Sequence, residues 1–266
     1  MPPHLFQIPG SKRQGRKIIR KFIPSTWRSL NSPFLGAAWV EMDCARGGMR
    51  VFGSDSNALQ INLLDQVLRN PRRVAYLIER YAPHVTDEDT YTALAGVVEF
   101  VTPLEVRAAA YHIVNHLSYA AMGAHGPYSR VKHEEYQRGL SAYVGAVRRF
   151  RCPNLSVECC DYREALARRP NIPAYLDPPY DSRSSYRWYG SFDHEALHDV
   201  LIRRSSPWIC SYSATPRIIN LYRDFRIVDL SGMWTHPTSK QKGNEIIILS
   251  HEVPLQRGNW RLIGGD

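Results

Sequence analysis

The segment from residue 174 to residue 180, Ala-Tyr-Leu-Asp-Pro-Pro-Tyr, joins an apolar strand to an acid, two prolines and an aromatic residue. Each proline fixes φ and keeps the residue before it extended, so Asp177 and the Pro178 carbonyl are expected to be held at a strand's carboxyl end. These two oxygens would accept both N–H bonds of a planar exocyclic amino group, such as that of adenine. Tyr180 would stack on the base, which reaches such a corner only after leaving a duplex. The purely structural interpretation is a rigid loop.

The segments around this corner alternate between strand and helix patterns. Strands are expected at 49–55, 155–159, 172–176, 208–212, 225–230 and 245–249. Helices are expected from residue 58, over 72–82, 103–118 and 134–150, from Asp193 through Arg204, and after Thr215-Pro216. This alternation predicts an α/β fold with a doubly wound sheet, helices on both faces and ligands at the carboxyl ends of the strands.

A mostly helical block interrupts the alternation. We therefore expect residues 1–60 and 151–266 to form one domain and residues 61–150 to form an inserted helical subdomain. The turn-forming residues Gly123, Gly126 and Pro127 predict a hairpin near 120–132.

Composition and charge limit the class of protein. The 34 Lys and Arg against 25 Asp and Glu give a formal net charge of +9, and no acid precedes Glu41. Nucleic acid is the natural polyanionic partner, although a solvated basic surface explains the charge equally well. No membrane-spanning run or signal core is found, so we expect a cytoplasmic protein. The five cysteines lack metal-ligand spacing and are interpreted as reduced thiols, with no metal site.

The Asp177-Pro178-Pro179-Tyr180 corner and the upstream Pro33-Phe34-Leu35-Gly36 loop together resemble the Dam-like DNA adenine-N6 methyltransferases, from about residue 8 to 250. The resemblance implies a Rossmann-like methyltransferase sheet. It also implies that a methyl group passes in line from S-adenosyl-L-methionine to adenine N6 of a flipped base in double-stranded DNA. Action as a monomer, without metal or membrane, is expected.

The resemblance also assigns roles to residues. Asp177, Pro178, Pro179 and Tyr180 are the expected catalytic residues. The expected cofactor-binding residues are Lys12, Phe34, Gly36, Asp55, Asp161 and Tyr162. Asp55 would receive the ribose hydroxyls, although it could instead cap the helix that starts at residue 58. Ala38 stands where the family has a second glycine, so the cofactor pocket is expected to be narrower or its loop shifted.

The inserted block takes the place of the family's target-recognition region, and residues 111–119 resemble its first helix. Tyr128, Arg130 and Lys132 are expected to contact nucleic acid, with Arg130 and Lys132 on phosphates rather than bases. The family's turn motifs are replaced here, so no recognition sequence is transferred. For Tyr186 and Tyr189, packing is favoured over contact with the base.

Other functions remain open at this point. Cytosine amino methylation uses the same geometry, but the acid at Asp177 favours adenine. A carbon-5 cytosine mechanism is disfavoured because Cys152 precedes Pro153 rather than following a proline. Ribosomal RNA adenine methylation suits the basic charge equally well. A non-catalytic binding protein of the same fold has no evident need for both Asp177 and Asp55.

Overall fold

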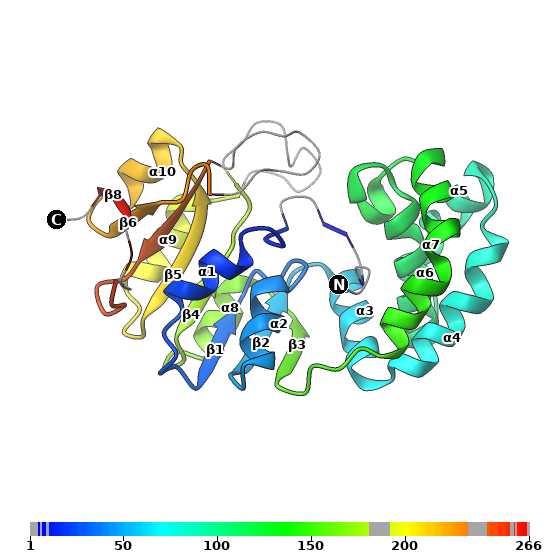
Figure 1. The fold of residues 1–266 in the computed structure, drawn as a ribbon, viewed down its shortest axis with the longest axis horizontal. Helices are drawn as coiled ribbons and strands as arrows, with labels where there is room; N and C mark the ends of the chain where they lie inside the picture. Colours follow the sequence, from blue (N-terminus) through cyan, green and yellow to red (C-terminus); the bar gives the residue numbers. More distant parts are fainter. Residues whose placement is uncertain are drawn as a thin grey trace. The chain divides into compact units, whose positions relative to one another are not determined.

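The computed structural model describes residues 5, 7–8, 11–180, 192–233, 244–255, 258 and 260–264 (Figure 1). The chain forms two compact units. The first comprises Met1–Ser11 and Asn57–Cys159, and the second comprises Lys12–Ser56 and Cys160–Asp266. None of the described helices is both long and apolar enough to cross a bilayer. The five cysteines, all in described segments, form no disulfide.

A mixed β-sheet organises the second unit. Its strands are β1 (Ser29–Ser32), β2 (Arg50–Asp55), β4 (Ala174–Leu176), β5 (Trp208–Ser213), β6 (Arg226–Asp229), β7 (Glu245–Leu249) and β8 (Arg261–Gly264). Within the unit they are hydrogen-bonded in the order β2-β1-β4-β5-β7-β6-β8. The pairs from β2 to β5 are parallel, and the pairs from β5 to β8 are antiparallel.

Helices flank this sheet, which confirms the predicted Rossmann-like α/β class (Figure 1). They are α1 (Arg16–Phe22), α2 (Trp39–Arg46), α8 (Tyr162–Arg168), α9 (His194–Ile202) and α10 (Pro216–Leu221). The predicted start signals operate as expected: the side chain of Asp193 accepts from the Ala196 amide, and Thr215 caps α10 with Pro216 in its first turn. The antiparallel direction of the last strands and the edge strand β8 were not predicted.

The core of this unit explains where the predicted catalytic corner emerges. All three residues of β4 and all five of β7 are buried, as in strands covered on both faces. Trp208 and Tyr212 of β5 belong to the same apolar cluster. Asp177 directly follows the buried strand β4. Its side chain therefore lies at the carboxyl end of that strand.

The first unit is built from helices. These are α3 (Ala58–Arg69), α4 (Pro71–Tyr81), α5 (Glu88–Val97), α6 (Leu104–Leu117) and α7 (Arg130–Arg148), with short 3-10 turns η1 (Ala82–His84) and η2 (Val98–Phe100), and the strand β3 (Leu155–Cys159). Helix α6 lies at the centre: every residue from Ala108 to Leu117 is buried, against α3, α4 and α7. Pro71 restarts a helix rather than ending one, because the Asn70 side chain accepts from the Arg73 amide.

The hairpin expected near 120–132 falls in the connection between α6 and α7. One antiparallel bridge joins Ser118 to Tyr128, and the turns η3 (Tyr119–Ala121) and η4 (Gly123–His125) fill the space between them. Ala120 and Gly123 have positive φ angles, which turn the backbone sharply within this loop. Helix α7 begins at Arg130, where the Ser129 side chain caps it by accepting from the Lys132 amide.

Candidate active site

Asp177 lies directly after β4 with one carboxylate oxygen held by two donors. Lys12 Nζ is 2.7 Å from Asp177 Oδ1, and Ser211 Oγ donates to the same oxygen at 2.9 Å. The Asp177 side chain is 20% exposed, whereas that of Lys12 is 6% exposed. Among the described residues, no hydrogen bond to Asp177 Oδ2 is found. The carboxylate is therefore anchored through one oxygen and can accept a further donor through the other.

The Lys12 ammonium is enclosed by groups that offset its burial. Besides Asp177, it lies 3.9 Å from Glu245 Oε2 and 4.4 Å from the centre of the Tyr180 ring. Burial, followed by the charges of Asp177 and Glu245, raises the pKa of Tyr180 well above its usual value, so its hydroxyl stays protonated. The sequence assigned Lys12 to the cofactor. The structure places its ammonium at the acid-proline corner, and a cofactor contact stays a prediction.

A further buried carboxyl, Glu41 on α2, lies close enough to feel the charges of Asp177 and Lys12. Its Oε1 accepts from Ser32 Oγ at 2.6 Å. Burial raises the pKa of Glu41 to about 7, and the Ser32 hydrogen bond opposes that rise. Neither Glu41 nor Ser211 was expected at this site from the sequence. Each could have been found as a polar residue within an apolar stretch, since Glu41 lies among the buried residues of α2 and Ser211 lies in the buried strand β5.

The loop predicted to meet the cofactor is tied to the end of β2. The Gly36 amide donates to Asp55 Oδ2 at 3.0 Å. Gly36 has a φ of +47°, and no heavy atom lies within 4 Å of the position a Cβ would take, so the backbone is open to close approach there. The cap of α3 is Asn57, which accepts from the Gln60 amide. The alternative role of Asp55 as the cap of that helix is therefore wrong.

Aromatic side chains connect this loop to the acid-proline corner. The rings of Phe34 and Tyr162 stack with centres 5.2 Å apart, and Phe192 contacts both at 5.6 and 5.7 Å. The series of ring contacts continues through His194 and Tyr212 to Tyr180, with spacings of 5.1, 5.5 and 6.4 Å. The predicted cofactor aromatics and the predicted base-stacking tyrosine thus belong to one run of contacting rings.

Asp161 has a structural role at the start of α8. Its side chain caps the helix by accepting from the Arg163 amide at 2.8 Å, and it is 52% exposed. The proposed contact with the cofactor's adenine stays a prediction. Tyr186 and Tyr189 lie outside the described residues, as do Pro9 and Gly10 before Lys12.

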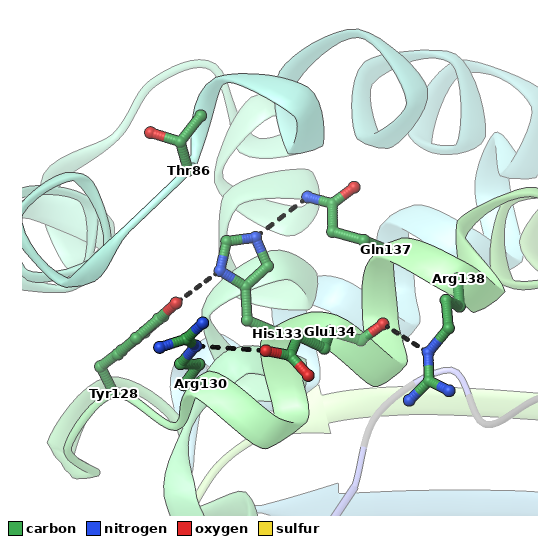
Figure 2. Close-up of a pocket in the computed structure, with 7 residues that line it drawn as sticks. All are labelled: Thr86, Tyr128, Arg130, His133, Glu134, Gln137 and Arg138. Carbon is green, nitrogen blue, oxygen red and sulfur yellow. Dashed lines mark hydrogen bonds and ion pairs between the residues drawn. The ribbon is translucent and has the colours of Figure 1, made fainter.

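The first unit contains a surface pocket of about 620 Å³ (Figure 2). It is lined by Thr86, Tyr128, Arg130, His133, Glu134, Gln137 and Arg138. In Figure 2, Tyr128 and Gln137 contact the two ring nitrogens of His133. The Tyr128 hydroxyl lies 2.6 Å from His133 Nδ1, and the Gln137 amide nitrogen lies 3.2 Å from His133 Nε2. Arg130 Nε donates to Glu134 Oε1 at 3.2 Å. Two of the three predicted nucleic-acid contacts thus line one pocket.

Lys132, the third of them, is not among the lining residues. It pairs instead with Glu135 at 2.8 Å. Both basic side chains therefore carry an acidic partner from the same helix, in exposed pairs of small net strength. Such partners are easily exchanged for phosphate oxygens. Within the described residues, no group of three or more His, Cys, Asp or Glu side chains could hold a metal ion.

The chain matches a known protein family over most of its length. A family model described as D12 class N6 adenine-specific DNA methyltransferase matches residues 9–235. The matched stretch includes every site residue expected from the sequence, from Lys12 to Tyr180, and all the helices of the first unit.

Proposed function

Since the chain belongs to the D12 class N6 adenine-specific DNA methyltransferase family, it methylates adenine N6 in DNA, and we propose that Asp177 and Pro178 hold the amino group that is methylated. The observation that carries this proposal is the state of Asp177: Oδ1 is anchored by Lys12 and Ser211, while Oδ2 accepts no hydrogen bond from the described residues. An anchored carboxylate with one available oxygen is a preorganised acceptor.

In this proposal, Asp177 Oδ2 accepts one N6–H bond and the Pro178 carbonyl accepts the other. Hydrogen bonds from both N6 protons localise the nitrogen lone pair, which is otherwise delocalised into the ring. They also stabilise the positive charge that develops on nitrogen during transfer. Pro179 restricts the backbone of this corner, and Tyr180 supplies a ring against which the base stacks. The surplus N6 proton leaves to Asp177 or to water. A base inside a duplex cannot reach this corner, so the target adenine must flip out.

S-Adenosyl-L-methionine, when bound, supplies an electrophilic methyl carbon on a sulfonium. The residues of the second unit suit such a molecule. The open backbone at Gly36 permits close approach, and the Asp55 carboxylate at the end of β2 suits ribose hydroxyls. Phe34 and Tyr162 offer aromatic surface to an adenine ring, and the half-exposed Asp161 beside them suits its amino group.

The first unit is proposed to hold the duplex and to recognise its target. The pocket between Thr86 and the start of α7 combines an aromatic ring, an amide and two guanidinium groups at the surface. Tyr128 and Arg130 from this pocket, with Lys132 beside it, are proposed to contact the DNA backbone, where the net charge of +9 favours counterion release.

The experiment that tests the catalytic assignment compares wild type with Asp177→Ala and Asp177→Asn on adenine-containing duplex DNA and labelled cofactor. Methyl transfer should fall at least about 1,000-fold in both variants, because a transition-state interaction is lost, while DNA binding survives. Asp224→Ala, which removes an 84% exposed carboxylate of the same unit, serves as the matched control and should retain full activity. Wild-type rates in a folded Asp177→Asn variant would contradict the assignment.

Parallel assays on RNA oligonucleotides test the alternative substrate, and the family match favours DNA. Mapping modified adenines in DNA from cells that express the protein would define its sequence preference.

A further inference from the structure

The strand that neighbours Asp177 carries a buried hydroxyl in direct contact with it. Strands β4 and β5 are parallel, with Leu176 paired to Cys210, so Asp177 and Ser211 follow at the next position of each strand. Tyr175 precedes Asp177 by two residues and therefore projects from the same face of β4. The three side chains are brought together by strand register alone.

The hydrogen bonds among these side chains have one consistent direction. Tyr175 Oη lies 3.1 Å from Ser211 Oγ, and Ser211 Oγ lies 2.9 Å from Asp177 Oδ1 and 3.3 Å from the Leu176 carbonyl. Ser211 has one proton to donate, and an ionised carboxylate is the strongest acceptor within reach. The Tyr175 hydroxyl then donates to Ser211, whose proton is directed to Asp177.

The environment keeps this chain of donors in place. Ser211 is fully buried and Tyr175 is 1% exposed, so water does not compete for these bonds. Burial, followed by the charge of Asp177, raises the pKa of Tyr175 well above its usual value, so the phenol remains a donor across the working pH range. The short side chain of Ser211, on a packed strand, restricts the orientation of its hydroxyl more tightly than the four-carbon arm of Lys12 restricts the ammonium.

We propose that Ser211, supported by Tyr175, is a positioning residue that sets the orientation of the Asp177 carboxylate and so turns Oδ2 toward the substrate amino group. This inference rests on the role proposed above for Asp177. The Lys12 ammonium balances the charge of the Asp177 carboxylate, and the Ser211 hydroxyl sets the orientation of that carboxylate. Without the hydroxyl, the carboxylate samples other rotations, so fewer bound complexes are aligned for transfer while binding itself is unchanged.

The test uses the full chain with four variants and one control. Ser211→Ala should lower kcat about 10- to 100-fold, with the Kd values for DNA and for S-adenosylmethionine within about twofold of wild type. Ser211→Thr and Ser211→Val have nearly the same shape, so both suffer the same crowding, but only threonine keeps the hydroxyl. Threonine should restore kcat to within about threefold of wild type, and valine should behave as alanine. Tyr175→Phe should lower kcat about threefold, because Ser211 then loses the hydrogen bond from the tyrosine hydroxyl.

Ser206→Ala is the matched control: it removes a buried serine hydroxyl of the same unit, which donates to the Pro170 carbonyl at 2.6 Å, and kcat should not change. Wild-type kcat in Ser211→Ala, or equal losses in the threonine and valine variants, would overturn the inference. Crystal structures give a second readout that does not depend on activity. The Asp177 carboxylate should keep its orientation in Ser211→Thr and turn in Ser211→Ala, and an unchanged carboxylate in both would also overturn it. A wild-type protein that methylates no DNA adenine would instead refute the proposed function.

Discussion

Ala38 is an alanine in a conformation that favours glycine. Its φ is 55° and its side chain is buried at the start of α2. A Cβ in the left-handed region meets the neighbouring carbonyl, which costs about 1 kcal/mol. We expect Ala38→Gly to raise the free energy of unfolding by about 0.5–1 kcal/mol, measured by urea denaturation. The neighbouring Ala37 has no positive φ, so Ala37→Gly should lower stability instead. A loss of stability in Ala38→Gly would show that the loop is not strained.

Glu41 makes stability depend on pH in the direction opposite to most carboxyl groups. Its pKa is raised from 4.5 to about 7 in the folded protein, chiefly by burial. The folded state therefore binds more protons than the unfolded state between these values, and stability falls as pH rises through this window. The full effect is on the order of 3 kcal/mol above pH 7.

Glu41→Gln keeps the shape of the side chain and removes the titration. The variant should be close to wild type in stability at pH 4.5 and more stable than wild type at pH 8. Urea denaturation at both pH values measures the difference, and Asp224→Ala, which removes an exposed carboxylate, should show no such gain. An equal offset between Glu41→Gln and wild type at both pH values would mean that folding does not raise the pKa of Glu41.

Helix α6 carries a buried histidine that should make the first unit sensitive to acid. His112 is fully buried, its Nδ1 lies 3.1 Å from the Tyr136 hydroxyl, and its ring stacks on that of His116 with centres 4.2 Å apart. Burial, followed by the charge of His116, lowers the pKa of His112 well below 6.5. The unfolded state then binds the extra proton, so stability falls as pH drops below 6.5, by up to about 1.4 kcal/mol per pH unit.

His112→Phe retains an aromatic ring without the titration and should flatten this acid slope, whatever it does to stability at neutral pH. Urea denaturation between pH 7.5 and 5.5, followed by a probe in the first unit, measures the slope. His125→Phe changes an exposed histidine of the same unit and should leave the slope as in wild type. If the slope of His112→Phe equals that of wild type, the acid sensitivity arises elsewhere.

Sequence patterns predicted the elements whose signals are local. The buried strand β7, the cap at Asp193 and the restart at Pro71 each depend on residues within a few positions of one another. Helix α5 was missed because Tyr91 is its one buried residue, so its apolar period is weak. The 3-10 turns between α6 and α7 were not predicted, because turn-forming residues alone do not define the type of turn.

Only those residues of the candidate site that belong to a recognisable sequence motif were predicted. Asp177 and its prolines are recognisable in the sequence, but the partners of Asp177 come from distant segments. Ser211 reaches it through the pairing of β4 with β5, and Lys12 reaches it from the start of the chain. Strand register and long-range ion pairs are set by tertiary packing, which local periodicity does not encode.

The whole molecule carries a net charge of +9, and its two units suggest separate contributions to catalysis. Arg130 and Lys132 lie in the first unit in exposed pairs with glutamates, whereas Asp177 lies in the second. Arg130→Ala and Lys132→Ala should each weaken DNA binding at low salt and reduce the slope of log K against log salt by about 1, because each removes one of the proposed phosphate contacts. At saturating DNA, kcat should stay near the wild-type value, the reverse of the result expected for Asp177→Asn.

Arg72→Ala removes an exposed arginine from α4 of the same unit and is the control for total charge. If Arg72→Ala changes the salt slope as much as Arg130→Ala does, binding follows net charge and not the surface at the start of α7.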